Sequence, residues 1–179
     1  MAQLNAYESL EAALDENHRS QLALDGIIIS TPTSSHPSII RQAADAEISI
    51  FTEKPVAETA DEIEATFRYA AKASIAVCCG FQRRFDPSYV AAKQNLEQIG
   101  KPTFAQIIFA DHPCPPKEFL LQGGDIFMDL SAHDVDFITD ALSDQVISVY
   151  ATGSASDADL ESAGVHDSAT MVMRMAKGK

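Results

Sequence analysis

Hydrophobic residues follow two patterns along roughly the first eighty residues, helical spacing and short apolar runs. These patterns predict alternating elements in the order helix 7–16, strand 25–31, helix 37–46, strand 48–51, helix 59–73 and strand 75–79. Runs such as Ile27-Ile28-Ile29 are typical of parallel strands that are covered on both faces. The alternation therefore predicts βαβ units and an open parallel sheet.

The pattern changes after the stretch 80–84, where we place a domain boundary. The elements predicted beyond it are a helix over 87–99, a loosely alternating strand over 103–110, a helix from Asp125 to about Leu142, and strands over 145–150 and 166–175. Strands with an alternating pattern favour an antiparallel sheet that is covered on one face. The sequence therefore predicts a second domain, built on an antiparallel sheet.

Polar residues gather in the loops that follow the three predicted parallel strands, at 31–36, 53–55 and 80–86. In open parallel sheets, ligands bind beyond the carboxyl ends of the strands. These loops are therefore the strongest physical indication of a ligand site.

Two glycines precede Asp125, which is well placed to cap the predicted helix 125–142. On that helix Asp129 and His133 are four residues apart, so they share one face. A carboxylate can orient an imidazole, and an imidazole can take up a proton near neutral pH. The same spacing also occurs as a solvated surface pair, so the pattern alone leaves both readings open.

Pro55 keeps Lys54 extended at the end of a predicted strand, so the amine can point into the crevice. A solvated pair with Glu53 is the alternative. Arg83 and Arg84 are either surface charges or paired donors for a polar ligand.

The charge balance excludes some partners. The 179 residues contain 26 acids against 13 Lys and Arg, a formal net charge of -13. Nucleic acid and anionic membrane need a basic surface and are not expected partners.

No signal peptide or membrane-spanning run is recognisable, so we expect a cytoplasmic protein. No metal site is expected, because the three cysteines lack ligand spacing.

Three motifs occur in a recognisable order, namely Thr31-Pro32 through His36, Glu53-Lys54-Pro55, and Gly123-Gly124 with Asp129 and His133. They resemble the turn, the E-K-P motif and the double-glycine signature of the glucose–fructose oxidoreductase and inositol dehydrogenase family (GFO/IDH/MocA). The stretches 80–89 and 149–153 look closest to its inositol dehydrogenase branch. The resemblance covers nearly the whole chain.

The resemblance implies an α/β fold, with an incomplete Rossmann-like parallel sheet in residues 1–82 and a partial α/β second domain with an open antiparallel sheet in residues 83–179. It implies an NAD- or NADP-dependent dehydrogenase that oxidises a secondary hydroxyl of a cyclic polyol or sugar, with myo-inositol the first guess. It also implies a homo-oligomer formed through the second-domain sheet.

By the same resemblance, His133 is the acid/base, Lys54 holds the reacting oxygen, and Asp129 binds a substrate hydroxyl. Further polyol contacts would be Arg84 and His112. The cofactor would be lined by Thr31, Pro32, His36, Glu53 and Lys54.

One departure from the family concerns the glycines, since no three of the eight have the G-x-G-x-x-G spacing. The first βαβ unit of the Rossmann domain is missing with them, on the order of 30 to 40 residues. We therefore expect a fragment or truncated copy with impaired NAD turnover. The alternatives are a non-catalytic relative that binds sugar or pairs with another subunit, and a metal hydrolase using His133, Asp129 and His112.

Overall fold

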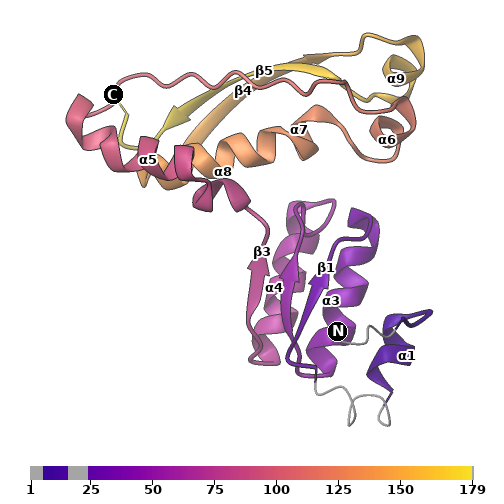
Figure 1. Ribbon diagram of the computed structural model, residues 1–179. Helices are drawn as coiled ribbons and strands as arrows, with labels where there is room; N and C mark the ends of the chain where they lie inside the picture. Colours follow the sequence, from indigo (N-terminus) through magenta and orange to yellow (C-terminus); the bar gives the residue numbers. More distant parts are fainter. Residues whose placement is uncertain (1–5, 16–23, 179) are drawn as a thin grey trace. The chain divides into compact units, whose positions relative to one another are not determined.

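The computed structural model describes residues 6–15 and 24–178, and the chain divides into two compact units, Met1–Gly80 and Phe81–Lys179. Figure 1 shows that each unit has its own sheet. The antiparallel and parallel sheets predicted from the sequence are both present, which confirms the fold class.

The first unit contains a parallel sheet of three strands in the order β1-β2-β3. Its elements are α1 (Leu10–Leu14), β1 (Gly26–Ile29), a 3-10 turn (Thr33–Ser35), α3 (His36–Asp45), β2 (Ser49–Thr52), α4 (Ala60–Lys72) and β3 (Val77–Cys79). The predicted order is confirmed, although α1 is shorter than the predicted helix 7–16, whose last residue lies outside the described ranges. Local caps explain the boundaries, since the Thr59 hydroxyl accepts from the Glu62 amide where α4 begins.

The core of the first unit lies between the sheet and the pair α3 and α4, which run side by side in Figure 1. Ile29 and Ile50 from the strands meet Ile40 from α3, and Ile63 from α4 packs against this cluster. Burial of these apolar side chains is the main force that holds the helices on the sheet.

The opposite face of this sheet carries exposed apolar side chains, so the prediction of strands covered on both faces is wrong for the described residues. Ile28 is 75% exposed and Phe51 is also exposed. Ile28, Phe51 and Cys78 are register partners and form one row across the sheet. A continuous apolar run does not distinguish a strand covered once from one covered twice.

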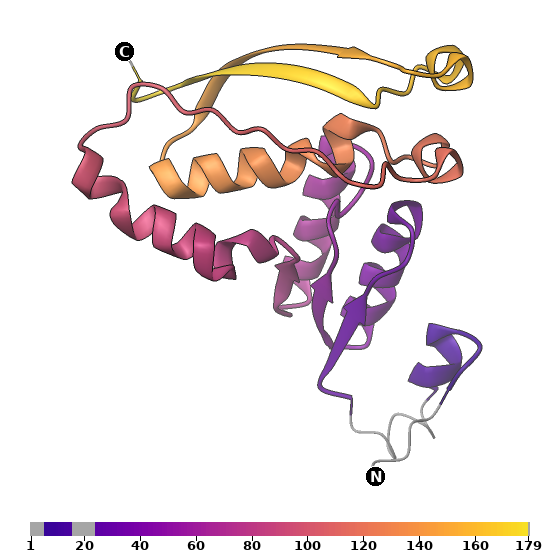
Figure 2. The ribbon, with the colours of Figure 1, turned by 45° about the horizontal axis from the view of Figure 1, so that its top comes forward.

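The second unit combines a two-stranded antiparallel sheet with helices. Its elements are a 3-10 turn (Gln82–Phe85), α5 (Pro87–Asn95) with a 3-10 extension (Leu96–Ile99), α6 (Lys117–Leu121), α7 (Ile126–Asp129), α8 (Ser131–Leu142), β4 (Val146–Ser154), α9 (Ala158–Ala163) and β5 (Ser168–Met175). Figure 2 shows α8 running along the β4–β5 ribbon, with α5 beside α8. The edge-to-face contact of Tyr89 with Phe137, 4.5 Å between centroids, joins these two helices.

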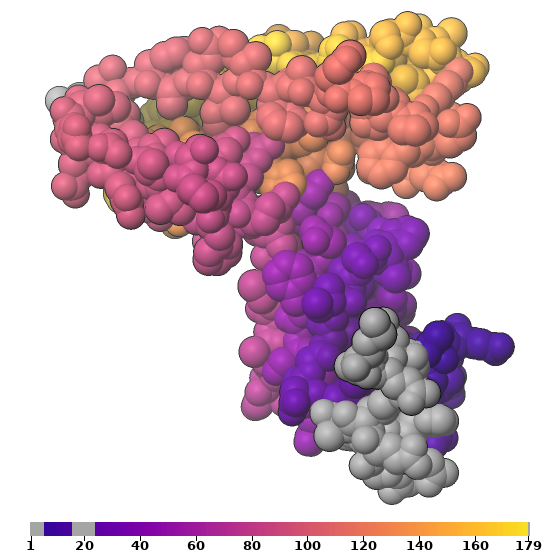
Figure 3. All heavy atoms as spheres, viewed as in Figure 1, coloured from indigo at the N-terminus to yellow at the C-terminus, as the bar shows by residue number. Residues whose placement is uncertain are grey.

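Two predictions about the second unit are wrong. The segment 103–110 is extended but belongs to no strand, because it forms no ladder of backbone hydrogen bonds. Figure 3 shows this segment at the surface of the unit. The helix predicted from Asp125 to Leu142 is two helices, α7 and α8, which meet at Leu130.

No helix in residues 6–15 and 24–178 is both long and apolar enough to cross a membrane.

Candidate active site

Lys54 lies at the carboxyl edge of the parallel sheet, where the sequence predicted a ligand site. It is the second residue after β2 and is half-buried. The Glu53 amide donates to the Ile29 carbonyl at 2.9 Å, and the Gly80 amide donates to the Thr52 carbonyl at 2.8 Å. These bonds continue the pairing of the three strands past their ends, so Lys54 extends from a fixed backbone. The Lys54–Pro55 peptide bond is cis.

His36 lies at the same edge but is buried, with 1% of its surface exposed. Its Nδ1 lies 2.9 Å from the Pro55 carbonyl oxygen and its Nε2 lies 2.7 Å from the Thr31 carbonyl oxygen. Thr31 and Pro32 are exposed in the preceding turn, where the Ser35 hydroxyl donates to the Pro32 carbonyl at 2.7 Å. The structure thus brings the predicted cofactor residues to one edge of the first unit.

This edge fits part of a dinucleotide. Thr31 and Glu53 provide polar groups beyond the ends of β1 and β2, the position at which doubly wound sheets bind nucleotides. At Gly80 a Cβ would lie 3.0 Å from the Glu53 carboxylate, so glycine leaves that carboxylate room. The glycine-rich turn that binds a pyrophosphate is not among these 179 residues. The residues present therefore match the edge of a dinucleotide site but do not include its phosphate-binding turn.

In the second unit, His133 and Asp129 lie on either side of the break at Leu130. His133 is in the first turn of α8 and is 7% exposed, with the Phe81 ring edge-on at 6.2 Å between centroids. Asp129 is the last residue of α7. The two residues are near in sequence as predicted, but they belong to separate helices and not to one helical face.

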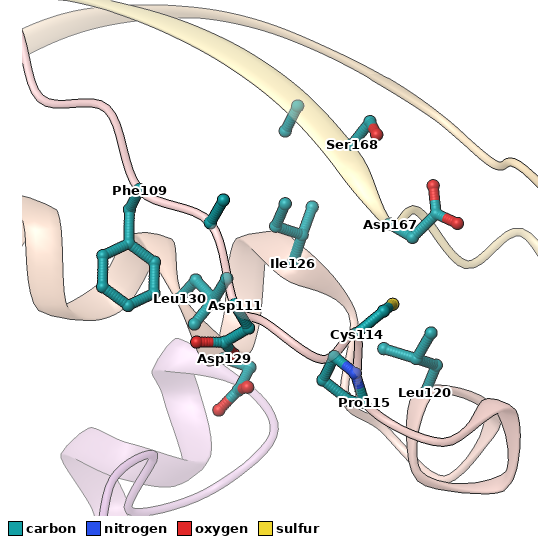
Figure 4. A pocket seen from close by; sticks show the side chains of 13 residues that line it. Phe109, Asp111, Cys114, Pro115, Leu120, Ile126, Asp129, Leu130, Asp167 and Ser168 are labelled. Carbon is teal, nitrogen blue, oxygen red and sulfur yellow. The ribbon is translucent and has the colours of Figure 1, made fainter.

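Asp129 lines a cavity of about 280 Å³ in the second unit. Figure 4 shows Asp129 and Asp111 on one side of this cavity, and Asp167 and Ser168 on the other side, where β5 begins. His112, a predicted polyol contact, is exposed and is not among the lining residues. Carboxylate oxygens accept hydrogen bonds, so the cavity offers acceptors to a hydroxylated ligand.

Asp125 fastens the beginning of α7 to the segment that enters β5. Its carboxylate accepts from the Phe127 amide at 2.9 Å, which is the predicted helix cap, and from the His166 amide at 2.9 Å. The His166 Nδ1 lies 3.0 Å from the same carboxylate. The ring of His166 in turn lies over Gly153, where an added Cβ would be 2.5 Å from the ring.

Burial by itself raises the pKa of Asp125, but the His166 and Phe127 amides and the His166 ring outweigh it and leave the pKa below its ordinary value. A carboxyl whose pKa is lower in the folded state stabilises the fold above its unfolded pKa of about 3.9. That stabilisation is lost as the pH falls through the lower, folded pKa.

We therefore predict that Asp125→Ala lowers the free energy of unfolding by about 1–2 kcal/mol at pH 7, as expected for a lost helix cap. The difference from the wild type should shrink as the pH falls below about 4, because the wild-type carboxyl then becomes protonated. Urea unfolding at pH 7 and at several values between 3 and 5 measures this. The exposed Asp25→Ala is the control, with a change within about 0.5 kcal/mol. A difference that stays constant down to pH 3 would contradict the prediction.

Arg83, which the sequence left open between a surface charge and a donor to a polar ligand, is the more buried of the two arginines. Its side chain is 11% exposed and pairs with Asp134, the neighbour of His133, while its guanidinium carbon lies 4.6 Å from the centre of the Phe109 ring. Arg84, which the sequence favoured as a polyol contact, donates from Nε to Asp136 at 2.9 Å and is the more exposed of the two. The two adjacent arginines are visible in the sequence, but their acidic partners lie some fifty residues further along the chain. The sequence therefore did not show which arginine is buried.

Within the described residues, no group of three or more His, Cys, Asp and Glu side chains is placed to hold a metal ion.

Two models of one protein family match this chain. Residues 1–81 match the GFO_IDH_MocA family model, described as an oxidoreductase family with an NAD-binding Rossmann fold. Residues 89–179 match the model of the GFO/IDH/MocA C-terminal domain. Both halves of the chain thus match parts of the same family in the expected order.

Individual relatives agree with this result. An inositol 2-dehydrogenase from Rhizobium meliloti is 30% identical over 180 residues, which cover 99% of this chain and 52% of the relative. The scyllo-inositol 2-dehydrogenase (NAD(+)) of Bacillus subtilis is 37% identical over 132 residues, which cover 73% of this chain and 39% of the relative. The chain thus spans about half the length, or less, of these curated relatives.

Among solved structures, scyllo-inositol dehydrogenase from Lactobacillus casei, with bound NAD(H) and scyllo-inositol, superposes with a TM-score of 0.73 at 25% identity. The likeness covers 94% of this chain and 51% of that one. With the two family models, the sheets and the motif order, these likenesses confirm the resemblance drawn from the sequence. The chain belongs to the GFO/IDH/MocA oxidoreductase family.

Proposed function

We propose that this chain takes part in NAD-dependent oxidation of a secondary hydroxyl on a cyclic polyol of the inositol type. The observation that carries the proposal is the 30% identity with inositol 2-dehydrogenase over 99% of the chain. Lys54, Asp129 and His133, the residues whose chemistry suits this reaction, all lie within that match.

His133 is the proposed acid/base. Oxidation of a secondary alcohol removes the hydroxyl proton, and an imidazole is the side chain best suited to take a proton near neutral pH. Its burial at the start of α8 and the edge-on Phe81 ring hold the imidazole in a defined place. A fixed ring meets the geometric requirement for proton transfer better than a mobile one.

Lys54 and Asp129 are the proposed binding groups for the reacting polyol. The Lys54 ammonium donates to the oxygen that becomes negatively charged as its proton leaves, which lowers the energy of that state. Asp129 accepts from a neighbouring hydroxyl and so helps to fix which carbon reacts. Arg84 and His112 remain predicted polyol contacts with a smaller role.

Thr31, Pro32 and Glu53 are the proposed cofactor contacts at the carboxyl edge of the parallel sheet, with Lys54 beside them. When bound there, NAD supplies the acceptor for the carbon-bound hydrogen. Pairing with a second copy through the β4–β5 sheet, and a cytoplasmic location, also stay predictions.

A non-catalytic, polyol-binding role is the second candidate. The observation in its favour is that the 179 residues contain no glycine trio with the dinucleotide-binding spacing. This role needs the polyol contacts but not turnover.

The test has two measurements on the purified 179-residue chain. The first is calorimetric titration of NAD, and of myo-inositol and scyllo-inositol in the presence and absence of NAD. The second is NADH formation from the same polyols at saturating NAD. The dehydrogenase proposal predicts binding of both ligands and polyol-dependent NADH formation, at a low rate because the phosphate-binding turn is missing.

Polyol binding without NADH formation would favour the second candidate. A folded chain that binds neither NAD nor any polyol would contradict both.

A further inference from the structure

His36 has an arrangement of hydrogen bonds that the proposed mechanism does not use. Both ring nitrogens of this buried side chain lie within hydrogen-bonding distance of a backbone carbonyl oxygen, Thr31 on one side and Pro55 on the other. A carbonyl oxygen can only accept a hydrogen bond, so each ring nitrogen must donate. A neutral imidazole has one N–H group, and only the doubly protonated ring can make both bonds.

From this geometry we propose that His36 is doubly protonated and acts as a positioning residue for Lys54, by tying the exits of β1 and β2 together. The ring joins the carbonyl of Thr31, two residues after β1, to the carbonyl of Pro55, three residues after β2. A buried cation needs hydrogen-bond acceptors in place of water, and the two carbonyls provide them.

Lys54 lies between two anchored neighbours. On one side the Glu53 amide donates to the Ile29 carbonyl at 2.9 Å. On the other side the Pro55 carbonyl accepts from His36 at 2.9 Å. Val56 and Ala57, which follow, are both buried. Without the His36 bond, the backbone on the Pro55 side of Lys54 would lose its hydrogen bond to α3.

This role differs from the cofactor contact that the sequence predicted for His36, because a ring with both nitrogens engaged and 1% exposure has no edge left for a dinucleotide. The functional meaning of positioning Lys54 rests on the proposed function, but the hydrogen-bonding arrangement does not. The simpler alternative is a core histidine that contributes packing alone.

The first experiment reads the ring directly in the unmodified chain. Long-range ¹H–¹⁵N correlation spectra of the ¹⁵N-labelled full chain at pH 7 distinguish protonated from unprotonated imidazole nitrogens, and His36→Gln assigns the signal by its disappearance. We expect both nitrogens of His36 to carry protons, and both protons to exchange slowly with water. A ring with one unprotonated nitrogen would overturn the proposal. The protonation state is measured in the wild-type chain, and His36→Gln serves only to assign the signal.

The second experiment measures the NMR signal and the reactivity of the Lys54 amine. Reductive methylation with ¹³C-formaldehyde labels the lysine amines, and Lys54→Arg assigns the Lys54 signal. We expect His36→Gln to shift or broaden that signal and to raise the rate at which Lys54 is methylated severalfold. Ser38→Ala, on the exposed side of α3, should leave both unchanged.

Ile40→Val controls for simple loss of packing, because it removes one methyl group from the core side of the same helix without touching the carbonyl pair. If Ile40→Val changes the Lys54 signal as much as His36→Gln does, His36 is a packing residue and the positioning role is wrong. Neither readout involves NAD or a polyol. The absence of NADH formation together with the expected spectra would contradict the proposed function and leave the His36 arrangement standing.

Discussion

Replacing His133 with asparagine should lower polyol-dependent NADH formation by about 10²–10⁴-fold, the usual contribution of a positioned acid/base. Asparagine retains a hydrogen-bonding side chain of similar length but cannot exchange a proton near neutral pH. The loss should fall on kcat, with a small change in KM, because binding of the polyol relies on other residues. Rates at saturating NAD, followed by NADH fluorescence over long times, measure this.

Two comparisons make that result interpretable. Met128→Ala alters an exposed side chain on α7 and should stay within about twofold of the wild-type rate, as expected for a surface change. A thermal melt of His133→Asn shows whether the fold persists. A folded His133→Asn protein that keeps more than about a tenth of the wild-type rate would exclude His133 as the acid/base.

Ile40→Ala should lower the free energy of unfolding by about 2–5 kcal/mol, the range for deleting several methyl groups from a packed core. Ile40 has no exposed surface and joins α3 to Ile29 and Ile50 of the sheet. The surrounding side chains can close the resulting cavity only in part, so the cost exceeds the simple transfer energy. Urea unfolding followed by circular dichroism measures the difference.

Ile28→Ala is the matched control, since it makes the same chemical change on the open face of the same sheet, where Ile28 is 75% exposed. Its effect should stay within about 0.5 kcal/mol. Equal losses for the two variants would mean that Ile28 is covered in solution, and the description of an open sheet face would then be wrong.

Features fixed by neighbours in the sequence were predictable. Asp125 and Thr59 cap their helices through amides two or three residues away, so the residue type and its place before an apolar stripe are sufficient. Pro37 lies in the first turn of α3 for a similarly local reason. The order of helices and strands followed from periodicity, which is also a local property.

Features fixed by distant partners were not predictable in the same way. The helix break at Leu130 interrupts a segment whose apolar spacing continues across it. The segment 103–110 has a strand-like pattern, but a strand also needs a partner, and no single segment specifies one. Arg83 and Arg84 look alike in the sequence, and Asp134 and Asp136 on α8 distinguish them.

The same distinction between local and distant determinants applies to the candidate site. The motifs identified Lys54, Asp129 and His133 as chemically interesting, because each residue type suits one step of alcohol oxidation. The two hydrogen bonds of the His36 ring could not be predicted from the sequence, because their acceptors are backbone carbonyls, which every residue has.

The contact between His166 and Gly153 limits how this chain can change over evolutionary time. The imidazole occupies the space that a side chain at position 153 would need. Any larger residue at 153 would displace the ring from Asp125 and so release the beginning of α7. Substitutions at positions 153 and 166 should therefore be tolerated mainly in pairs, a larger residue at the first compensated by a smaller one at the second.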